Sequence, residues 1–567
     1  MDYSISLADD HWFRENINCQ YACPVNTPAM SYIERIVEEN FGASLQLNFM
    51  ANLFPHILGR VCTHPCEAAC RRGSIDEPIA ICALKRSAAD FSEIKYPQRP
   101  ARIKKTGKQV AVIGSGPSGL AAAHDLAVKG HSVVVYEALS VAGGMLTVGI
   151  PAYRLPREKI EDAVNWIRKL GVDIRLNTPI DTPDTFDNLV KQHDAVYIAT
   201  GAHKSPLIDI PGEELEGVIH GIAFTKETNM GKRTSAPEKV AVIGGGFTAI
   251  DCARSAVRLG AKEVAIVYRR TLEEMPAGEL EVRMAEEENI KIYYLTTPIK
   301  IIAGRNQQVT RLECVKNELG EPDEKGRRRP MPIEGSNFIM PVDMVIPAIG
   351  QSPDIGFLTE QSGIEITRWN TPAIDQKNFM TARKGVFAGG DCITGPRNVI
   401  EVIADGRKAA RSIHAYLTGQ EEKGYRFFYK NQSPSGRMPN YEAAPRQCQD
   451  SLSLQKRWNL DTESELGFSR EKTAKEAGRC LLCHFNIFID EKCVLCGGCI
   501  DVCPHNCISM VSRENIEDIK VLEEEGAAED WNAAMVLDEE KCIRCGLCVQ
   551  RCPVNAITMK RFAYSKE

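Results

Sequence analysis

Cysteine is the residue type whose number and spacing most strongly indicate chemistry in this chain of 567 residues, which contains 21 of them. All but four of these cysteines fall in two regions, residues 19 to 82 and 480 to 552. The first residues, MDYSISLADDHWF, have no basic n-region, and no apolar run approaches the ~20 residues that cross a bilayer. We therefore expect a cytoplasmic protein without a membrane span. In that reducing compartment, metal or redox chemistry explains grouped cysteines better than structural disulfides do.

Two runs near the C-terminus share the spacing CxxCxxCxxxCP, which is typical of a ferredoxin with two 4Fe-4S clusters. Three cysteines of each run bind one cluster, and the fourth, before proline, crosses to the other cluster. The predicted ligands of the first cluster are Cys493, Cys496, Cys499 and Cys552, and those of the second are Cys542, Cys545, Cys548 and Cys503. Zinc, which favours CxxC pairs, explains this spacing poorly. Cys507 is left over and is interpreted as a small buried residue rather than a ligand.

The N-terminal cysteines have a different spacing, and here the residues carry a family resemblance. CPVNTP, GRVC and CEAAC resemble the N-terminal iron-sulfur domain of glutamate synthase small subunits and dihydropyrimidine dehydrogenase, and the resemblance continues to about residue 425. It implies a helical domain with two 4Fe-4S clusters. The resemblance assigns one cluster to Cys23, Cys62, Cys66 and Cys82.

The second N-terminal cluster lacks half of its ligands in this region. It would use Cys19 and Cys70, but the CxxC pair with which the family's ligands begin is missing here. The distant segment AGRCLLC carries Cys480 and Cys483 in a context that resembles the missing pair. We predict that these two cysteines complete the cluster. The alternative is that they form a solvent-side pair or merely begin the ferredoxin module.

Two glycine loops indicate how the chain binds dinucleotides. KQVAVIGSGPSGLAAAHDLAVKGHSVVVYEA predicts a strand over residues 109 to 113, a glycine loop, a helix and a second strand that ends at Glu137. Gly114 makes the turn, Gly116 lets a pyrophosphate approach the helix N-terminus, and Gly119 admits close helix packing. Glu137 can accept hydrogen bonds from the ribose hydroxyls.

EKVAVIGGGFTAIDCARSAVRLGAKEVAIVYRR repeats this unit from residue 238, and its glycine positions hold Gly244, Gly246 and Ala249. Aligning the second strands places Arg269 where the first unit has its acid, and Arg270 follows. Arginine suits a 2′-phosphate through charge-assisted bidentate contact, whereas a carboxylate would repel it. The sequence therefore favours NADP(H) over NAD(H). The alternative is that these arginines cap a strand or pair with Glu273 and Glu274.

Two further segments complete the pattern of a two-dinucleotide flavoprotein. In that family the ATG turn of AVYIATGA, residues 195 to 202, marks where the chain leaves the FAD domain. The same family resemblance implies that the Gly-Gly-Asp within residues 385 to 410 places Gly390 and Asp391 at the ribityl-phosphate end of the flavin. We expect FAD on the first fold, and the remaining cofactor-binding candidates are Pro117, Ser118, Gly144, Thr200, Gly201, Phe247 and Thr248.

No catalytic protein group is assigned. AGGMLTVGIPAYRLP, after the first acid, lacks the cysteine pair of disulfide reductases, and Cys252 stands alone. Direct hydride transfer from nicotinamide C4 to flavin N5 remains, for which the protein supplies stacking and orientation. His193 and His203, near the ATG turn, are interpreted as satisfied surface or core histidines.

The expected fold is multidomain α/β. It comprises a helical iron-sulfur domain (1–105), an FAD domain in two parts (106–235 and 341–420), an inserted NAD(P)H domain (236–340), a linker (421–478) and a bacterial two-cluster 4Fe-4S ferredoxin-like domain (479–567).

One segment of the last domain is strongly acidic. Residues 514 to 540 hold eleven acids and one base, and are either a solvated loop or a docking face for a basic partner.

Nicotinamides supply hydrides and clusters accept single electrons, so the combination predicts a two-electron to one-electron converter. We expect a hetero-oligomer in which a ferredoxin or a catalytic oxidoreductase subunit, such as a 2-oxoacid:ferredoxin enzyme, exchanges the electrons. The alternatives are a stand-alone NADPH-dependent reductase of Fe(III) or a quinone, a glutamate synthase-type input subunit, and a scaffold that relays a partner's electrons. A net charge of -6 argues against nucleic-acid binding.

Overall fold

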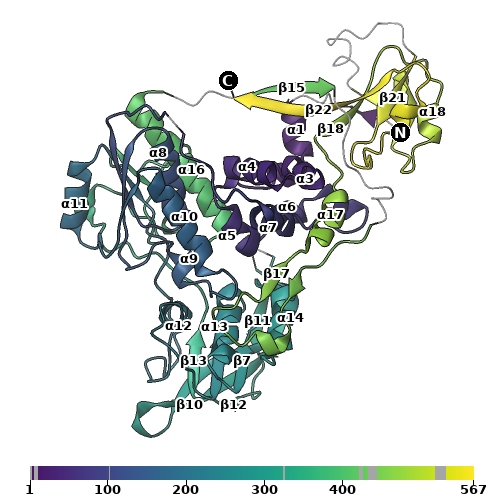
Figure 1. Ribbon diagram of the computed structural model, residues 1–567. Helices are drawn as coiled ribbons and strands as arrows, with labels where there is room; N and C mark the ends of the chain where they lie inside the picture. The colour runs from purple at the N-terminus through teal and green to yellow at the C-terminus, as the bar shows by residue number, and fades with distance from the viewer. Residues whose placement is uncertain are drawn as a thin grey trace. The chain divides into compact units, whose positions relative to one another are not determined.

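The structure is a computed structural model that describes residues 3–5, 10–100, 102–323, 326–420, 425–431, 444–517 and 532–566. The chain divides into two compact units (Figure 1). Unit 1 contains Met1–Pro97, Glu422–Gln449 and Gly467–Glu567, and unit 2 contains Gln98–Glu421 and Asp450–Leu466. The two cysteine-rich regions, distant in sequence, therefore belong to the same unit.

The N-terminal part of unit 1 is helical. Its helices are α1 (Asp10–Asn16), α2 (Asn18–Tyr21), α3 (Ala29–Val37), α4 (Phe41–Asn52), α5 (Pro55–Val61), α6 (Pro65–Ala68), η1 (Arg71–Ser74) and α7 (Ile81–Phe91). Helix α17 (Arg470–Gly478), from much later in the chain, packs against α3 and α7. Its Ala477 shares one apolar core with Tyr32 and Leu84. This packing brings the segment before Cys480 onto the N-terminal helices.

In its described residues, the ferredoxin-like part of unit 1 is built from short helices and strands, most of which pair antiparallel. One sheet has the order β15-β22-β18 and another pairs β19 with β21, while β1 (Tyr3–Ser4) pairs with β20 (Ile516–Glu517). The other elements are β15 (Tyr425–Asn431), β18 (Phe485–Ile489), α18 (Gly498–Asp501), β19 (Ile508–Ser512), η7 (Arg513–Asn515), β21 (Ala533–Leu537), α20 (Leu547–Arg551) and β22 (Ile557–Lys566). Most of the predicted acidic insert, including Glu523 to Glu525, lies outside the described residues.

The first dinucleotide fold of unit 2 is a five-stranded parallel sheet of order β14-β5-β2-β3-β4. Its elements are β2 (Gln109–Ile113), α8 (Pro117–Val128), β3 (Ser132–Tyr136), α9 (Met145–Val148), α10 (Arg157–Lys169), β4 (Asp173–Arg175), α11 (Pro183–Gln192), β5 (Ala195–Ile198), β14 (Val386–Ala388), α15 (Asp391–Thr394) and α16 (Val399–Thr418). Helices α8 and α16 lie side by side (Figure 1). Strands β2 and β5 are almost wholly buried, as expected of parallel strands covered on both faces.

The second fold is a four-stranded parallel sheet of order β13-β6-β7-β8. Its elements are α12 (Gly221–Asn229), β6 (Lys239–Ile243), α13 (Phe247–Arg258), β7 (Glu263–Val267), η2 (Leu272–Glu274), α14 (Glu279–Glu287), β8 (Lys291–Tyr293) and β13 (Met344–Pro347). Directly after α14, the buried carboxylate of Glu288 accepts hydrogen bonds of 2.7 to 3.2 Å from the guanidiniums of Arg254 and Arg258 on α13. This buried ion pair joins α13 to the end of α14.

The structure extends the inserted domain past its predicted end at residue 340, because strand β13 pairs with β6. An antiparallel sheet that the sequence did not predict precedes it, formed by β9 (Thr296–Ala303), β10 (Val309–Pro322), β11 (Arg328–Pro332) and β12 (Phe338–Pro341).

The described residues of the predicted linker include several secondary-structure elements. These are β15, α17, η6 (Leu454–Lys456) and the paired strands β16 (Asp450–Ser451) and β17 (Glu465–Gly467). The 450–466 segment packs on unit 2, where Arg457 contacts Glu287 at 3.0 Å.

Candidate functional site: a dinucleotide groove and four cysteine groups

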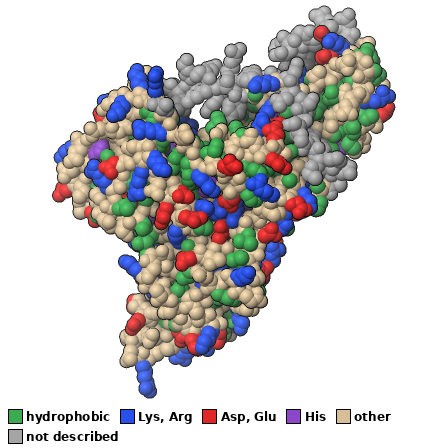
Figure 2. Space-filling model, in the orientation of Figure 1, with side chains coloured by type: hydrophobic (Ala, Val, Ile, Leu, Met, Phe, Trp, Pro, Cys, Tyr) green, Lys and Arg blue, Asp and Glu red, His purple; other side chains and the backbone are tan. Residues whose placement is uncertain are grey.

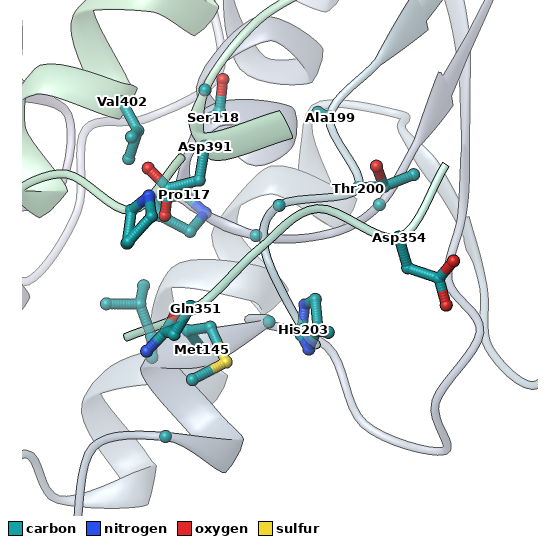
Figure 3. A pocket seen from close by; sticks show the side chains of 18 of the residues that line it. Pro117, Ser118, Met145, Ala199, Thr200, His203, Gln351, Asp354, Asp391 and Val402 are labelled. Carbon is teal, nitrogen blue, oxygen red and sulfur yellow. The ribbon is translucent and has the colours of Figure 1, made fainter. Parts of the chain in front are cut away.

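Both glycine loops open onto one groove of about 980 Å³ in unit 2. This volume lies at the upper end of the range for ligand sites. Figure 3 shows part of the lining, with Pro117, Ser118 and Asp391 toward one side and Met145 and Gln351 toward the other. The predicted residues that line the groove are Gly114, Gly116, Pro117, Ser118, Glu137, Gly144, Thr200, Gly201, Gly246, Phe247, Thr248, Gly390 and Asp391.

The glycine loops also depend on close packing, and the predicted residues Gly119, Gly244 and Ala249 do not line the groove. Gly114 has φ +102°, and a Cβ there would lie 2.4 Å from the carbonyl oxygen of Ala199 at the end of β5. Gly244 repeats this arrangement, since its Cβ would lie 2.3 Å from the carbonyl oxygen of Ala348 after β13. Only glycine fits at these two positions. The structure therefore repeats one loop geometry in both folds, with Gly119 and Ala249 one turn into the following helices.

Glu137 lies at the end of β3, where the sequence predicts it, and faces the groove. Its carboxylate accepts hydrogen bonds from the backbone N–H of Ser115 at 3.0 Å and of Leu139 at 2.9 Å. These bonds hold the carboxylate against the glycine loop. A carboxylate can accept about four hydrogen bonds, so capacity for a ribose hydroxyl remains.

Two buried polar atoms in the lining have no hydrogen-bond partner in the protein. They are the Thr200 hydroxyl oxygen and Nε of Arg397. Buried polar groups are usually satisfied, so both atoms are suited to contact a bound polar ligand. Asp391 lines the same groove and accepts a hydrogen bond from the backbone N–H of Arg397 at 2.9 Å, and burial raises the pKa of its carboxyl to about 7. The donor set fits a dinucleotide with hydroxyl and phosphate groups.

The arginines expected to select NADP(H) do not line the groove. Arg269 is exposed outside the lining. Arg270 is buried, donates from Nε to the carbonyl oxygen of Arg328 at 2.7 Å, and lies 3.8 Å from Asp323. Arg327, which sequence reasoning missed, does line the groove. The long β10–β11 hairpin brings Arg327 there, and no local sequence signal predicted that hairpin.

No cysteine lines the groove among the described residues, so the groove has no thiol for disulfide exchange. His203 differs from expectation, because its ring lies in the lining (Figure 3) and burial lowers its pKa. His193 is satisfied as predicted, with Nδ1 2.9 Å from the carbonyl oxygen of Leu189.

The ferredoxin cysteines meet in unit 1 around two small cavities. One is lined by Cys493, Cys496, Cys499 and Cys552, and the other by Cys503, Cys542, Cys545 and Cys548. In each group the cysteine before proline crosses from the other run, as the spacing indicates. Cys507 is buried as expected, but it also lines the second cavity, with its sulfur 3.1 Å from that of Cys503.

A third cavity is lined by Cys19, Cys70, Cys480 and Cys483, which come from opposite ends of the chain. Arg479, fully buried, holds the late segment there by contacting Asp76 at 3.0 Å and donating to the carbonyl oxygen of Glu77 at 2.8 Å. Arg72 donates to the carbonyl oxygen of Arg479 at 2.8 Å. Burial, followed by the charges of the neighbouring thiols, raises the pKa of Cys19.

The fourth group is formed by Cys23, Cys62, Cys66 and Cys82. Cys23 and Cys62 follow helices α2 and α5, and Cys66 and Cys82 lie within α6 and α7. Burial raises the pKa of the Cys82 thiol, and the charges of the Cys62 and Cys66 thiols raise it further. The buried ammonium of Lys85 interacts with all four thiols, which raise its pKa although burial alone would lower it. A buried cation surrounded by thiols suits a group that carries net negative charge.

Other surface and metal features complete the description. Among the described residues, no group of three or more His, Cys, Asp or Glu side chains is arranged to bind a single metal ion. No described helix is both long and apolar enough to span a membrane. On the face shown in Figure 2, basic and acidic side chains are interspersed.

Comparisons with protein families match three segments of the chain. Residues 108–408 match the family "Pyridine nucleotide-disulphide oxidoreductase". Residues 13–96 match "Dihydroprymidine dehydrogenase domain II, 4Fe-4S cluster", and residues 492–556 match "4Fe-4S dicluster domain". The three matches cover the groove, the N-terminal cysteines and the two CxxCxxCxxxCP runs, whereas Cys480 and Cys483 lie outside them.

Individual relatives span most of the chain. It is 40% identical over 500 residues to the NADP(+)-dependent formate dehydrogenase subunit beta of Moorella thermoacetica, covering 82% of this chain and 70% of that one. It is 39% identical over 508 residues to the NADPH-Fe(3+) oxidoreductase subunit beta of Geobacter sulfurreducens, covering 82% and 75%. It is 34% identical over 420 residues to the glutamate synthase [NADPH] small chain of Escherichia coli, covering 71% and 89%.

Proposed function

Because the chain belongs to the pyridine nucleotide-disulphide oxidoreductase family, together with the glutamate synthase small chains, and carries two 4Fe-4S domains, we propose that it is an electron-transfer subunit. It would exchange hydride electrons with NADPH in the groove and pass them singly through four 4Fe-4S clusters. The observation that carries this proposal is that sixteen cysteines fall into four groups of four within unit 1.

The groove supports the nicotinamide half of the proposal. FAD, when bound, would accept a hydride and release its electrons one at a time. The chain's own residues would bind and orient the two dinucleotides. Ser115 and Leu139 hold the Glu137 carboxylate beside the first loop, and Thr200 and Arg397 offer unsatisfied polar atoms. No protein nucleophile or acid-base group is needed for this transfer.

The cluster assignments rest on the cysteine groups. Cys493, Cys496, Cys499 and Cys552 would hold one cluster, and Cys503, Cys542, Cys545 and Cys548 a second. Cys19, Cys70, Cys480 and Cys483 would hold a third, and Cys23, Cys62, Cys66 and Cys82 a fourth. Thiolates enclosed by apolar surroundings are the usual ligands of such clusters.

Iron content tests this assignment. The protein, purified anaerobically, should contain about sixteen irons and sixteen acid-labile sulfides per FAD, since each 4Fe-4S cluster adds four of each. Cys480→Ser should lower both to about twelve while FAD stays bound, because the flavin groove lies in unit 2. Cys448→Ser, which replaces an exposed cysteine outside the four groups, is the matched control. About eight irons in the unmodified protein would refute the N-terminal assignments.

The partner is proposed from the relatives, which are named as subunits of formate dehydrogenase, of an Fe(3+) oxidoreductase and of glutamate synthase. We expect a hetero-oligomer in which a ferredoxin or a catalytic oxidoreductase subunit exchanges electrons with the ferredoxin-like domain. The second candidate is direct reduction of Fe(III), which the Geobacter relative favours.

Acceptor assays separate the two candidates. NADPH should bleach the bound flavin and drive the reduction of an added two-cluster ferredoxin. Fast reduction of chelated Fe(III) by the isolated chain, with no transfer to ferredoxin, would support the second candidate instead.

A further inference from the structure

Arg544 is a fully buried arginine in the ferredoxin-like part of unit 1, and it lines the cavity of Cys503, Cys542, Cys545 and Cys548. Its Nε donates to the carbonyl oxygen of Phe485 at 3.1 Å, and Nη1 donates to the carbonyl oxygen of Glu539 at 3.2 Å. Nη1 also donates to the carbonyl oxygen of Cys542, and Nη2 pairs with the carboxylate of Glu539. These bonds fix the guanidinium at the cavity wall.

The cavity of Cys19, Cys70, Cys480 and Cys483 adjoins this wall. Leu481 lines that cavity and Ile543 lines the ferredoxin cavity, and these two side chains pack together in one small apolar cluster. Cys483 and Cys545, one from each cavity, pack against the same cluster. The two cysteine groups are therefore separated only by a few buried side chains.

The charges at this junction link the two cavities. The guanidinium of Arg544 interacts electrostatically with the thiols of both Cys483 and Cys542. On the other side of the junction, Arg71 lines the Cys480 cavity and lies 3.9 Å from the Glu539 carboxylate. Two arginines, one at each cavity, thus share a single carboxylate. The three side chains leave a net positive charge in a buried position, where solvent screens it little.

We propose that Arg544 raises the reduction potentials of the two neighbouring clusters, and that electrons pass directly between these two clusters. This inference rests on the proposed function, because it requires clusters in both cavities. Reduction adds one negative charge to a cluster, so a buried cation nearby stabilises the reduced form and raises the potential. When an electron passes, the donor cluster is oxidised and the acceptor cluster is reduced by one electron, and no proton is transferred.

The test is an anaerobic redox titration followed by electron paramagnetic resonance, with each cluster signal assigned by Cys480→Ser and Cys545→Ser. Arg544→Met removes the charge while keeping an apolar side chain in the site. It should shift the Cys480 and Cys542 clusters to lower potential and leave the other two unchanged. Arg544→Lys, which keeps the charge, should restore most of the shift. Arg551→Met, at an exposed arginine of the same domain, is the control and should shift neither potential.

Glu539→Gln provides an independent test if Arg544→Met does not fold. It removes the shared negative charge and keeps both arginines, so both potentials should rise. Unchanged potentials in Arg544→Met and Glu539→Gln, at about sixteen irons per FAD, would overturn the role of Arg544 and leave the proposed function intact. About twelve irons in the unmodified protein, with no signal lost in Cys480→Ser, would instead show that the Cys480 cavity holds no cluster.

Discussion

The preference for NADPH should depend on Arg327 rather than on the two arginines that the sequence indicates. Arg327 lines the dinucleotide groove, and its side chain is 51% exposed. Partial burial lowers the pKa of Arg269 most, the charge of Arg270 lowers it next, and the charge of Arg327 lowers it further. Arg327 and Arg269 therefore lie close enough to form one basic patch. Arg270, in contrast, is held by Arg328 and Asp323. A 2′-phosphate in the groove would therefore meet Arg327 first.

The size of the effect follows from these surroundings. A hydrogen bond to a charged group contributes about 1.5–3 kcal/mol. Arg327 is half exposed and lies 3.4 Å from the Asp323 carboxylate, so solvent and this acid offset part of its charge and the lower end applies. Since about 1.4 kcal/mol corresponds to a factor of ten, Arg327→Ala should lower kcat/KM for NADPH about tenfold. The value for NADH should stay unchanged, because NADH carries no 2′-phosphate.

Flavin bleaching by NADPH and by NADH, followed in a stopped-flow instrument, measures both values. Arg329→Ala changes a neighbouring exposed arginine that does not line the groove and should leave both values unchanged. Asp323→Asn, which removes the competing carboxylate, should raise the preference for NADPH. An equal loss for NADPH and NADH in Arg327→Ala would show that Arg327 only supports the groove and would refute the reasoning.

Three further outcomes are expected. Glu288→Gln removes the carboxylate that the buried guanidiniums of Arg254 and Arg258 share, leaving only the Glu281 carboxylate 3.9 Å from Arg254. It should destabilise the second dinucleotide fold by about 3–5 kcal/mol, seen as faster hydrogen exchange in α13 and α14. Glu287→Gln, next to it and exposed, should cost at most about 1 kcal/mol. Lys85→Met should lower the potential of the Cys82 cluster at constant iron content, and an unchanged potential would contradict this. Burial lowers the pKa of His131 to about 4. Its neutral form therefore stabilises the fold above the unfolded pKa of about 6.5, and this stability is lost as pH falls toward 4. His131→Gln should flatten that part of a thermal melting profile, and an unchanged profile would show that another group is responsible.

Local sequence determined the parts of this protein whose geometry depends on neighbouring residues. The glycine loops are predictable because Gly114 and Gly244 have positive φ and almost touch a carbonyl oxygen, which excludes any side chain. The CxxCxxCxxxCP spacing likewise places three sulfurs in one turn, so the ferredoxin groups could be proposed from spacing alone. The pairing of the Cys480 segment with Cys19 and Cys70 came from a family resemblance, since no local rule relates residues so far apart.

Only the tertiary structure decided which side chains face the cavities. Alignment placed Arg269 and Arg270 at the end of a strand, but the β10–β11 hairpin covers Arg270 and brings Arg327 to the groove. Arg544 stands between two cysteines in the sequence, and its burial beside two cysteine groups depends on contacts with the distant Phe485 and on the packing of Leu481 against Ile543. Side-chain direction and burial depend on contacts between distant segments. A one-dimensional pattern records the spacing of ligands but not the charges that surround them.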